Sequence, residues 1–377
     1  MFFTDVIGQE KFKSLLIKSV REQKISHAQL FAGEEGYGGL PLAIAISQYI
    51  LCENRQESES CGVCPSCIQM KKLIHPDLHF VFPVVSGKTI QKPVSDDFIE
   101  EWRNAIIENP YLSASKWLTK LGVDNKQGLI YTQESNSILK KLNLKSFESE
   151  FKIMIIWQPE KMHNSCSNKL LKIIEEPPPK TIFLLVSKEP AQLLPTILSR
   201  IQMFRLNPIE PLTLLETLRR EAGISEKEVQ NYSRLAQGSY SRAKEMMEST
   251  EEWNTNFEKF KNWMRLCYSR NINGLIEWVE LVNRDGREKN KSFLAYSLRM
   301  IRENFLLNIY PEKQSEFLRM TEDENVFSEK FSVFIKEENI ASLSQLINDA
   351  ITDISLNAYT KTVMLDLSLK IIPLIRK

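Results

Sequence analysis

The stretch GEEGYGGL, residues 33–40, has the frame of a phosphate-binding loop without its working residues. Such loops read G-x-x-x-x-G-K-[ST]: backbone N–H groups cradle the phosphates, the lysine neutralises them, and the hydroxyl holds Mg²⁺. Gly33 and Gly38 have the required spacing, but Gly39 and Leu40 stand where the lysine and the hydroxyl residue belong. We therefore expect a loop that binds no ATP.

Short apolar runs alternate with helical patterns around this loop. The runs 151–157 and 181–187 are almost continuously apolar, which is typical of strands buried on both faces of a parallel sheet. This alternation predicts an α/β domain with helices on both faces of the sheet. The expected strands are 28–33, 77–84, 151–157, 181–187 and 202–206, and the helices named between them are 9–22, 41–51 and 164–176, the last ended by Pro177, Pro178 and Pro179.

The end of the third expected strand lacks the same chemistry as the loop. A working site would have an aspartate there for Mg²⁺ and a glutamate for the attacking water, but the chain has Trp157, Gln158 and Pro159. Two separate stretches have lost one function, which favours an inherited nucleotide-binding fold whose own site is inactive.

The strand pattern stops near residue 208. We predict an α/β domain at 1–207, a small helical domain at 208–250 and a C-terminal all-helical bundle at 251–377. The small domain is expected to contain helices at 210–222, 225–237 and 239–249, with breaks at Gly223 and Gly238.

An insertion at 86–128 interrupts the α/β pattern and is expected to form one or two helices of its own. It begins with SGKT, 86–89, which resembles the end of a phosphate loop. Phe82 stands where the first glycine of such a loop belongs, so we expect no phosphate site there.

Four of the six cysteines have metal-ligand spacing, C-x8-C-x2-C-x2-C, at Cys52, Cys61, Cys64 and Cys67. Four thiolates complete the tetrahedral shell of Zn²⁺ and leave no position for water, so the expected role is structural. Because four sulfurs suffice, the nearby histidines at 75 and 79 are excluded as ligands. Cys166 and Cys267 stand alone in the sequence, and Cys166, which lacks a His/Asp context for catalysis, is expected to be a partly buried thiol.

The net charge of +1 gives no argument for nucleic-acid binding by bulk charge. No run approaches the roughly 20 apolar residues that cross a bilayer, and the first residues do not resemble a secretory signal. The expectation is a cytoplasmic protein with no membrane partner.

The ordered motifs resemble bacterial clamp-loader subunits of the AAA+ class, and most closely the delta-prime subunits of DNA polymerase III. The resemblance covers roughly residues 1–250; the insertion departs from it, and the rest matches only in being helical. The motifs are VIGQE (6–10), SHAQLFAGEEGYGG (26–39), the four cysteines, HPD (75–77), NKLLKIIEEPP (168–178), TIFLLVS (181–187), LPTILSRIQMF (194–204) and GSYSRA (238–243).

The resemblance implies a function. The gamma or tau motor subunits keep the lysine and threonine of the loop, whereas delta-prime subunits commonly do not. It therefore implies a non-hydrolysing subunit in a hetero-oligomer with gamma/tau and delta, whose C-terminal domain serves as the oligomerising collar. The assembly would open a sliding clamp and place it on primed DNA. The motor subunits also have an arginine where this chain has Ser241, followed by Arg242.

Ser199 and Arg200 match a family motif, S-R-C, although Ile201 replaces the cysteine. The resemblance implies that Arg200 reaches the ATP of a neighbouring subunit. A guanidinium suits that role because it is always charged and its planar donors match phosphate oxygens.

Two alternatives stay open. The chain could be an ATP-hydrolysing gamma/tau-type motor with an unusual loop, or a zinc-dependent nucleic-acid-binding module. The residues Gly39, Leu40, Trp157 and Gln158 argue against the first, and the neutral charge argues against the second.

Overall fold

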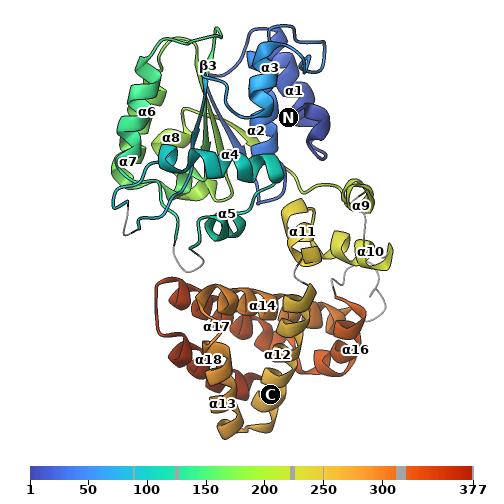
Figure 1. Cartoon of the computed structure of the whole chain (residues 1–377). Helices are drawn as coiled ribbons and strands as arrows, with labels where there is room; N and C mark the ends of the chain where they lie inside the picture. Colours follow the sequence, from blue (N-terminus) through green and yellow to red (C-terminus); the bar gives the residue numbers. More distant parts are fainter. Residues whose placement is uncertain (88–89, 124–126, 221–225, 249, 311–319, 376–377) are drawn as a thin grey trace. The chain divides into compact units, whose positions relative to one another are not determined.

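The computed structural model describes residues 1–87, 90–123, 127–220, 226–248, 250–310 and 320–375. They belong to two compact units, Met1–Lys244 and Glu245–Lys377 (Figure 1). The expected break at Gly223 and the last two residues of SGKT lie outside the described residues.

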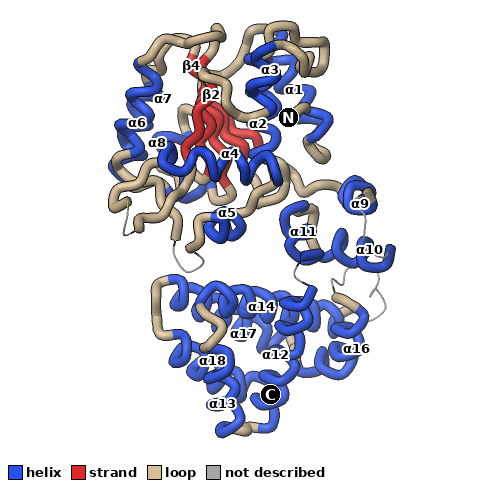
Figure 2. The backbone as a smooth tube through the Cα atoms, in the orientation of Figure 1, coloured by secondary structure: helices blue, strands red, loops and turns tan. Residues whose placement is uncertain are grey.

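Five parallel strands form the sheet of the first unit, drawn in red in Figure 2. Their order is β2-β3-β4-β1-β5. Every residue of β3 and β4 is buried, which explains their continuous apolar runs. The five predicted strands are confirmed, with ends shifted by a few residues. They are β1 (Ala28–Ala32), β2 (Leu78–Val81), β3 (Lys152–Trp157), β4 (Thr181–Ser187) and β5 (Gln202–Arg205).

Helices cover both faces of this sheet, as the α/β pattern predicts. One face is covered by α1 (Glu10–Arg21), α2 (Gly39–Leu51), α3 (Pro65–Lys71), α4 (Ile99–Glu108) and α5 (Ala114–Lys120). The other is covered by α6 (Glu134–Asn143), α7 (Asn164–Glu175) and α8 (Pro195–Leu198). The predicted start of α2 at residue 41 was two residues late, since Gly39 and Leu40 are already helical.

The insertion has helices of its own, as predicted, and belongs to the core. A short 3₁₀ turn, η2 (Ser95–Phe98), leads into α4 and α5. Trp102 of α4 stacks on Phe82, with ring centroids 4.1 Å apart. Trp117 of α5 donates its Nε1–H to the carbonyl of Pro83, at 2.7 Å. Two buried tryptophans therefore fix the insertion to the end of β2.

Three helices follow the sheet: α9 (Pro211–Arg219), α10 (Glu226–Leu235) and α11 (Tyr240–Glu248). Gly238 precedes α11 with a φ of +76°, and a Cβ there would lie 2.6 Å from Pro208 Cβ. Only glycine fits this close approach, which holds the start of α11 against residues 208–209.

The described residues of the second unit form α-helices, one short 3₁₀ turn and their connections. Their core includes Trp263, Phe260 and Phe293, all almost completely buried. No helix among the residues that the structure describes is long and apolar enough to span a membrane. The α-helices are α12 (Thr250–Ser269), α13 (Ile272–Asn283), α14 (Arg287–Ile309), α16 (Glu322–Phe331), α17 (Glu337–Ser355) and α18 (Thr360–Ile375).

Candidate functional site

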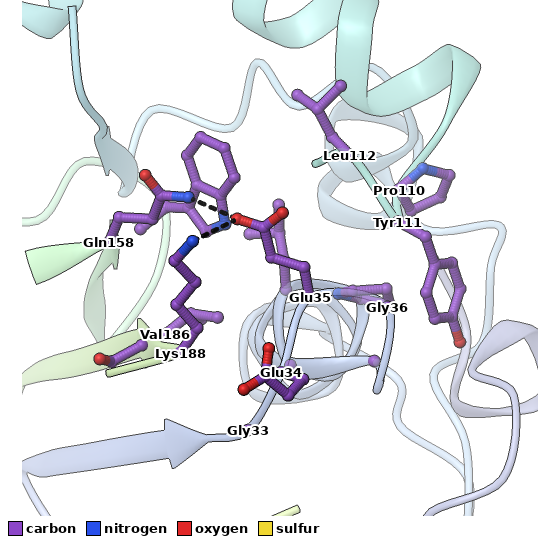
Figure 3. A pocket seen from close by; sticks show the side chains of 16 residues that line it. Gly33, Glu34, Glu35, Gly36, Pro110, Tyr111, Leu112, Gln158, Val186 and Lys188 are labelled. Carbon is purple, nitrogen blue, oxygen red and sulfur yellow. Dashed lines mark hydrogen bonds and ion pairs between the residues drawn. The ribbon is translucent and has the colours of Figure 1, made fainter. Parts of the chain in front are cut away.

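The loop 33–40 connects β1 to the N-terminus of α2, where the phosphates of a nucleotide would meet free backbone N–H groups. Its residues line a pocket together with those that follow β3 and β4 (Figure 3). Ligands of open parallel sheets bind at this edge, the carboxyl ends of the strands. The structure thus brings Gly33, Gly38, Gly39 and Leu40 together in one place.

Very little space remains in this pocket. Its volume is about 30 Å³, room for about two water molecules. Pockets for small molecules usually measure about 300 Å³ or more. A nucleotide would have to displace the side chains that occupy the pocket.

Glu35 is one of the residues that fill the pocket. Gln158, held at φ +54° after β3, donates from Nε2 to Glu35 Oε1 at 3.0 Å. The ammonium of Lys188, after β4, lies 3.8 Å from the same oxygen (Figure 3). A carboxylate therefore engages the only cation among the described residues that line the pocket. Sequence reasoning missed Glu35, although two acids directly after Gly33 are an unusual feature in a loop meant for anions.

The residues that replace the catalytic groups are packed in the core. A Cβ on Gly39 would lie 3.0 Å from Val186 Cγ1, so a lysine there would force its neighbour to move. Leu40 and Trp157 are both 4% exposed. Trp157 packs against Trp102 of the insertion, with ring centroids 5.1 Å apart. Neither side chain can hold Mg²⁺.

The four predicted cysteines also come together. Their sulfurs all lie within 4.8 Å of one another. The Cys52–Cys61 and Cys61–Cys67 sulfur distances are 3.5 and 3.9 Å, and a tetrahedral zinc with bonds of about 2.3 Å sets its sulfurs about 3.8 Å apart. The group fits a metal ion such as zinc. Neither His75 nor His79 belongs to it.

The electrostatics of the cysteine cluster also favour a cation. Backbone N–H groups of Val63 and Cys64 lower the pKa of the Cys61 thiol to about 6, which favours its thiolate form. Burial raises the pKa of Cys52 and Cys67 instead. Buried thiolates at these two positions need a compensating positive charge, which a metal ion supplies.

A family described as "DNA polymerase III, delta subunit" matches residues 8–210, more than half of the 377-residue chain. The chain belongs to this family. The resemblance to clamp-loader subunits, drawn from the ordered motifs, is thereby confirmed.

The individual relatives include both delta' subunits and gamma/tau subunits of DNA polymerase III. The DNA polymerase III subunit delta' of Bacillus subtilis is 29% identical over 210 residues, 56% of this chain and 51% of the relative. The subunit gamma/tau of Mycobacterium bovis is 26% identical over 218 residues, 58% of this chain and 31% of the relative. The chain therefore spans about half the length of the first relative and about a third of the second.

A solved structure of a DNA polymerase III gamma subunit-related protein from Thermotoga maritima overlaps 94% of this chain and 97% of its own. Its sequence identity is 13% and its TM-score 0.38. A TM-score this low supports no argument about function.

Arg200 of this family member lies between α8 and β5, with its side chain 41% exposed. Its guanidinium contacts Glu175 Oε1 at 2.9 Å and donates to Ser199 Oγ at 3.1 Å and to the carbonyl of Thr196 at 2.9 Å. The structure thus brings Ser199 and Arg200 together and adds Glu175, the last residue of α7. The motif gave no signal for this ion pair.

Arg200 does not join the loop 33–40. It comes just before β5, while the loop comes just after β1, and these two strands are parallel neighbours. The arginine therefore lies at the amino ends of the strands and the loop at their carboxyl ends. The five residues of β1, at about 3.3 Å each, separate the two edges by roughly 15 Å.

Proposed function

We propose that this chain is a non-hydrolysing, delta-prime-type subunit of a DNA polymerase III clamp loader. It joins gamma/tau and delta subunits in a hetero-oligomer that opens a sliding clamp and loads it on primed DNA. It does not turn over ATP in its own loop and supplies Arg200 to the ATP site of a neighbouring subunit.

The observation that carries this proposal is the separation of the loop from the arginine. The loop 33–40 has a carboxylate in a nearly filled pocket, and Arg200 is exposed at the other edge of the sheet. A guanidinium in that position cannot serve the phosphates of its own chain. Its exposed guanidinium can exchange its ion pair with Glu175 for phosphates that another subunit holds against this surface.

We further infer that the four cysteines hold Zn²⁺ in a structural role. Cys52, Cys61, Cys64 and Cys67 would be its ligands. Four thiolates leave no open position on the metal, so its contribution would be to tie the end of α2 to α3.

Replacing Arg200 with alanine tests the trans role. In a complex reconstituted with gamma/tau and delta subunits, we expect Arg200→Ala to slow hydrolysis at one class of ATP site by at least about tenfold, because the transition-state charge there loses its partner. Single-turnover hydrolysis in the presence of clamp and primed DNA is the measurement. Size-exclusion chromatography checks that the complex still assembles.

Glu175→Gln is the matched control. It removes the same surface ion pair from the other side and leaves Arg200 in place. Exposed pairs of this kind contribute about 0–1 kcal/mol, so we expect nearly unchanged hydrolysis. Unchanged rates in Arg200→Ala, or an equal loss in Glu175→Gln, count against the trans role.

A gamma/tau-type motor is the second candidate, since a relative with that name matches. It requires a loop that accepts ATP. The Glu35–Gln158 hydrogen bond and the tight fit of a side chain at Gly39 favour the delta-prime-type assignment.

A further inference from the structure

The insertion reaches the pocket of the loop 33–40. The link between α4 and α5 carries Pro110, Tyr111 and Leu112, which all line the pocket (Figure 3). Tyr111 is 5% exposed. Its hydroxyl oxygen accepts the backbone N–H of Ile7 at 2.6 Å, and a Cβ on Gly38 would lie 3.5 Å from that oxygen. One side chain therefore contacts both the N-terminal segment and the loop.

The same residue contacts the start of α11. Ser241 donates its hydroxyl to the carbonyl of Tyr111 at 2.6 Å. The rings of Tyr111 and Tyr240 meet edge to face, with centroids 4.8 Å apart. Ser241 stands where the motor subunits have an arginine. In this chain its hydroxyl is hydrogen-bonded to the insertion instead.

The loop itself is hydrogen-bonded to the same segment. Ser239 donates its hydroxyl to the carbonyl of Glu35 at 2.6 Å, and the N–H of Tyr240 donates to the carbonyl of Gly36 at 3.1 Å. A Cβ on Gly36 would lie 2.2 Å from Ser239 Oγ. The loop and the segment 239–241 therefore touch directly, with no space for a ligand between them at this point.

We propose that the insertion acts as an internal ligand of the phosphate loop. Pro110–Leu112 lines the pocket and joins the N-terminal segment, the loop and the start of α11, as a bound nucleotide would otherwise have to do. The first unit is thus held in one closed arrangement whether or not ATP is present. This role does not depend on which complex the chain enters.

These contacts are suited to hold the loop 33–40 permanently in place. Trp102 and Trp117 anchor α4 and α5 in the core, so the link between them is held in place independently of its contacts with the loop. Its covalent connection keeps the effective concentration of Tyr111 at the pocket high. Burial raises the pKa of Tyr111, so the hydroxyl stays protonated and its contacts are insensitive to pH near neutrality.

Backbone hydrogen exchange on the full chain tests whether Pro110–Leu112 holds the loop 33–40 in place. In Tyr111→Ala, and more weakly in Tyr111→Phe and Ser241→Ala, peptides covering residues 6–9, 36–40 and 239–243 should exchange faster, by about tenfold in Tyr111→Ala. Tyr131→Phe is the matched control, because the Tyr131 hydroxyl also accepts a backbone N–H, that of Ser86. It should leave the three segments unchanged.

Two results would overturn the proposal. One is unchanged exchange of residues 36–40 and 239–243 in Tyr111→Ala, Tyr111→Phe and Ser241→Ala alike. The other is slower exchange of these segments in the unaltered chain when Mg²⁺ and ATP are added, since an occupied nucleotide site is incompatible with an internal ligand. If Tyr111→Ala does not fold, the two milder variants decide. Because no partner subunit is present, these results are separate from the fate of the Arg200 experiment.

Discussion

Cys64→Ser is expected to release the bound metal and to lower the melting temperature of the first unit by about 5 °C or more. Cys64 precedes α3, and its sulfur accepts the N–H of Cys67 at 3.4 Å. Serine also accepts that hydrogen bond well, since it is a preferred residue at the start of a helix. The substitution therefore removes a metal ligand and leaves the helix start satisfied.

The metal content and the melting temperature are measured together. The control is Cys166→Ser, which makes the same chemical change at a buried thiol outside the cluster. It should keep one metal ion per chain, even if burial of the hydroxyl costs stability. Full metal content in Cys64→Ser, with an unchanged melting temperature, would contradict a four-cysteine zinc site.

Trp102→Ala is expected to destabilise the first unit by about 3–5 kcal/mol, the usual cost of removing a large aromatic side chain from a core. Trp102 is 0% exposed. It packs on Phe82, Trp117 and Trp157, so its loss leaves a cavity between the insertion and the sheet. Denaturant unfolding followed by far-ultraviolet circular dichroism measures the change without relying on tryptophan fluorescence.

Trp102→Phe is the matched variant. The indole N–H of Trp102 has no hydrogen-bond partner among the described residues, so phenylalanine loses volume but no hydrogen bond. We expect a smaller loss, about 1–2 kcal/mol. A loss below about 1 kcal/mol in Trp102→Ala would mean that the insertion is not part of the core.

The sheet could be predicted because its signals are local. Buried parallel strands such as 152–157 and 181–187 are nearly continuous apolar runs, and the spacing of the cysteines is typical of a chain that turns around a metal ion. The loop 33–40 was recognisable from its two spaced glycines. Each of these patterns lies within one short stretch of the sequence.

The contacts that fill the pocket could not be predicted in this way. Glu35 meets Gln158 across 123 positions, and Tyr111 meets Ser241 across 130. Neither pair has a spacing rule, because each depends on how separate elements pack in space. The sequence shows Trp157 where a working site is expected to have an acid. Its contact with Trp102 of the insertion appears only in the fold.

Titration of ATP and Mg²⁺ into the full chain by isothermal calorimetry tests most directly the central claim that the loop 33–40 has no nucleotide function. We expect no saturable heat up to about 1 mM ATP, corresponding to a binding free energy weaker than about −4 kcal/mol. A micromolar Kd that disappears on substitution within residues 33–40 would contradict it.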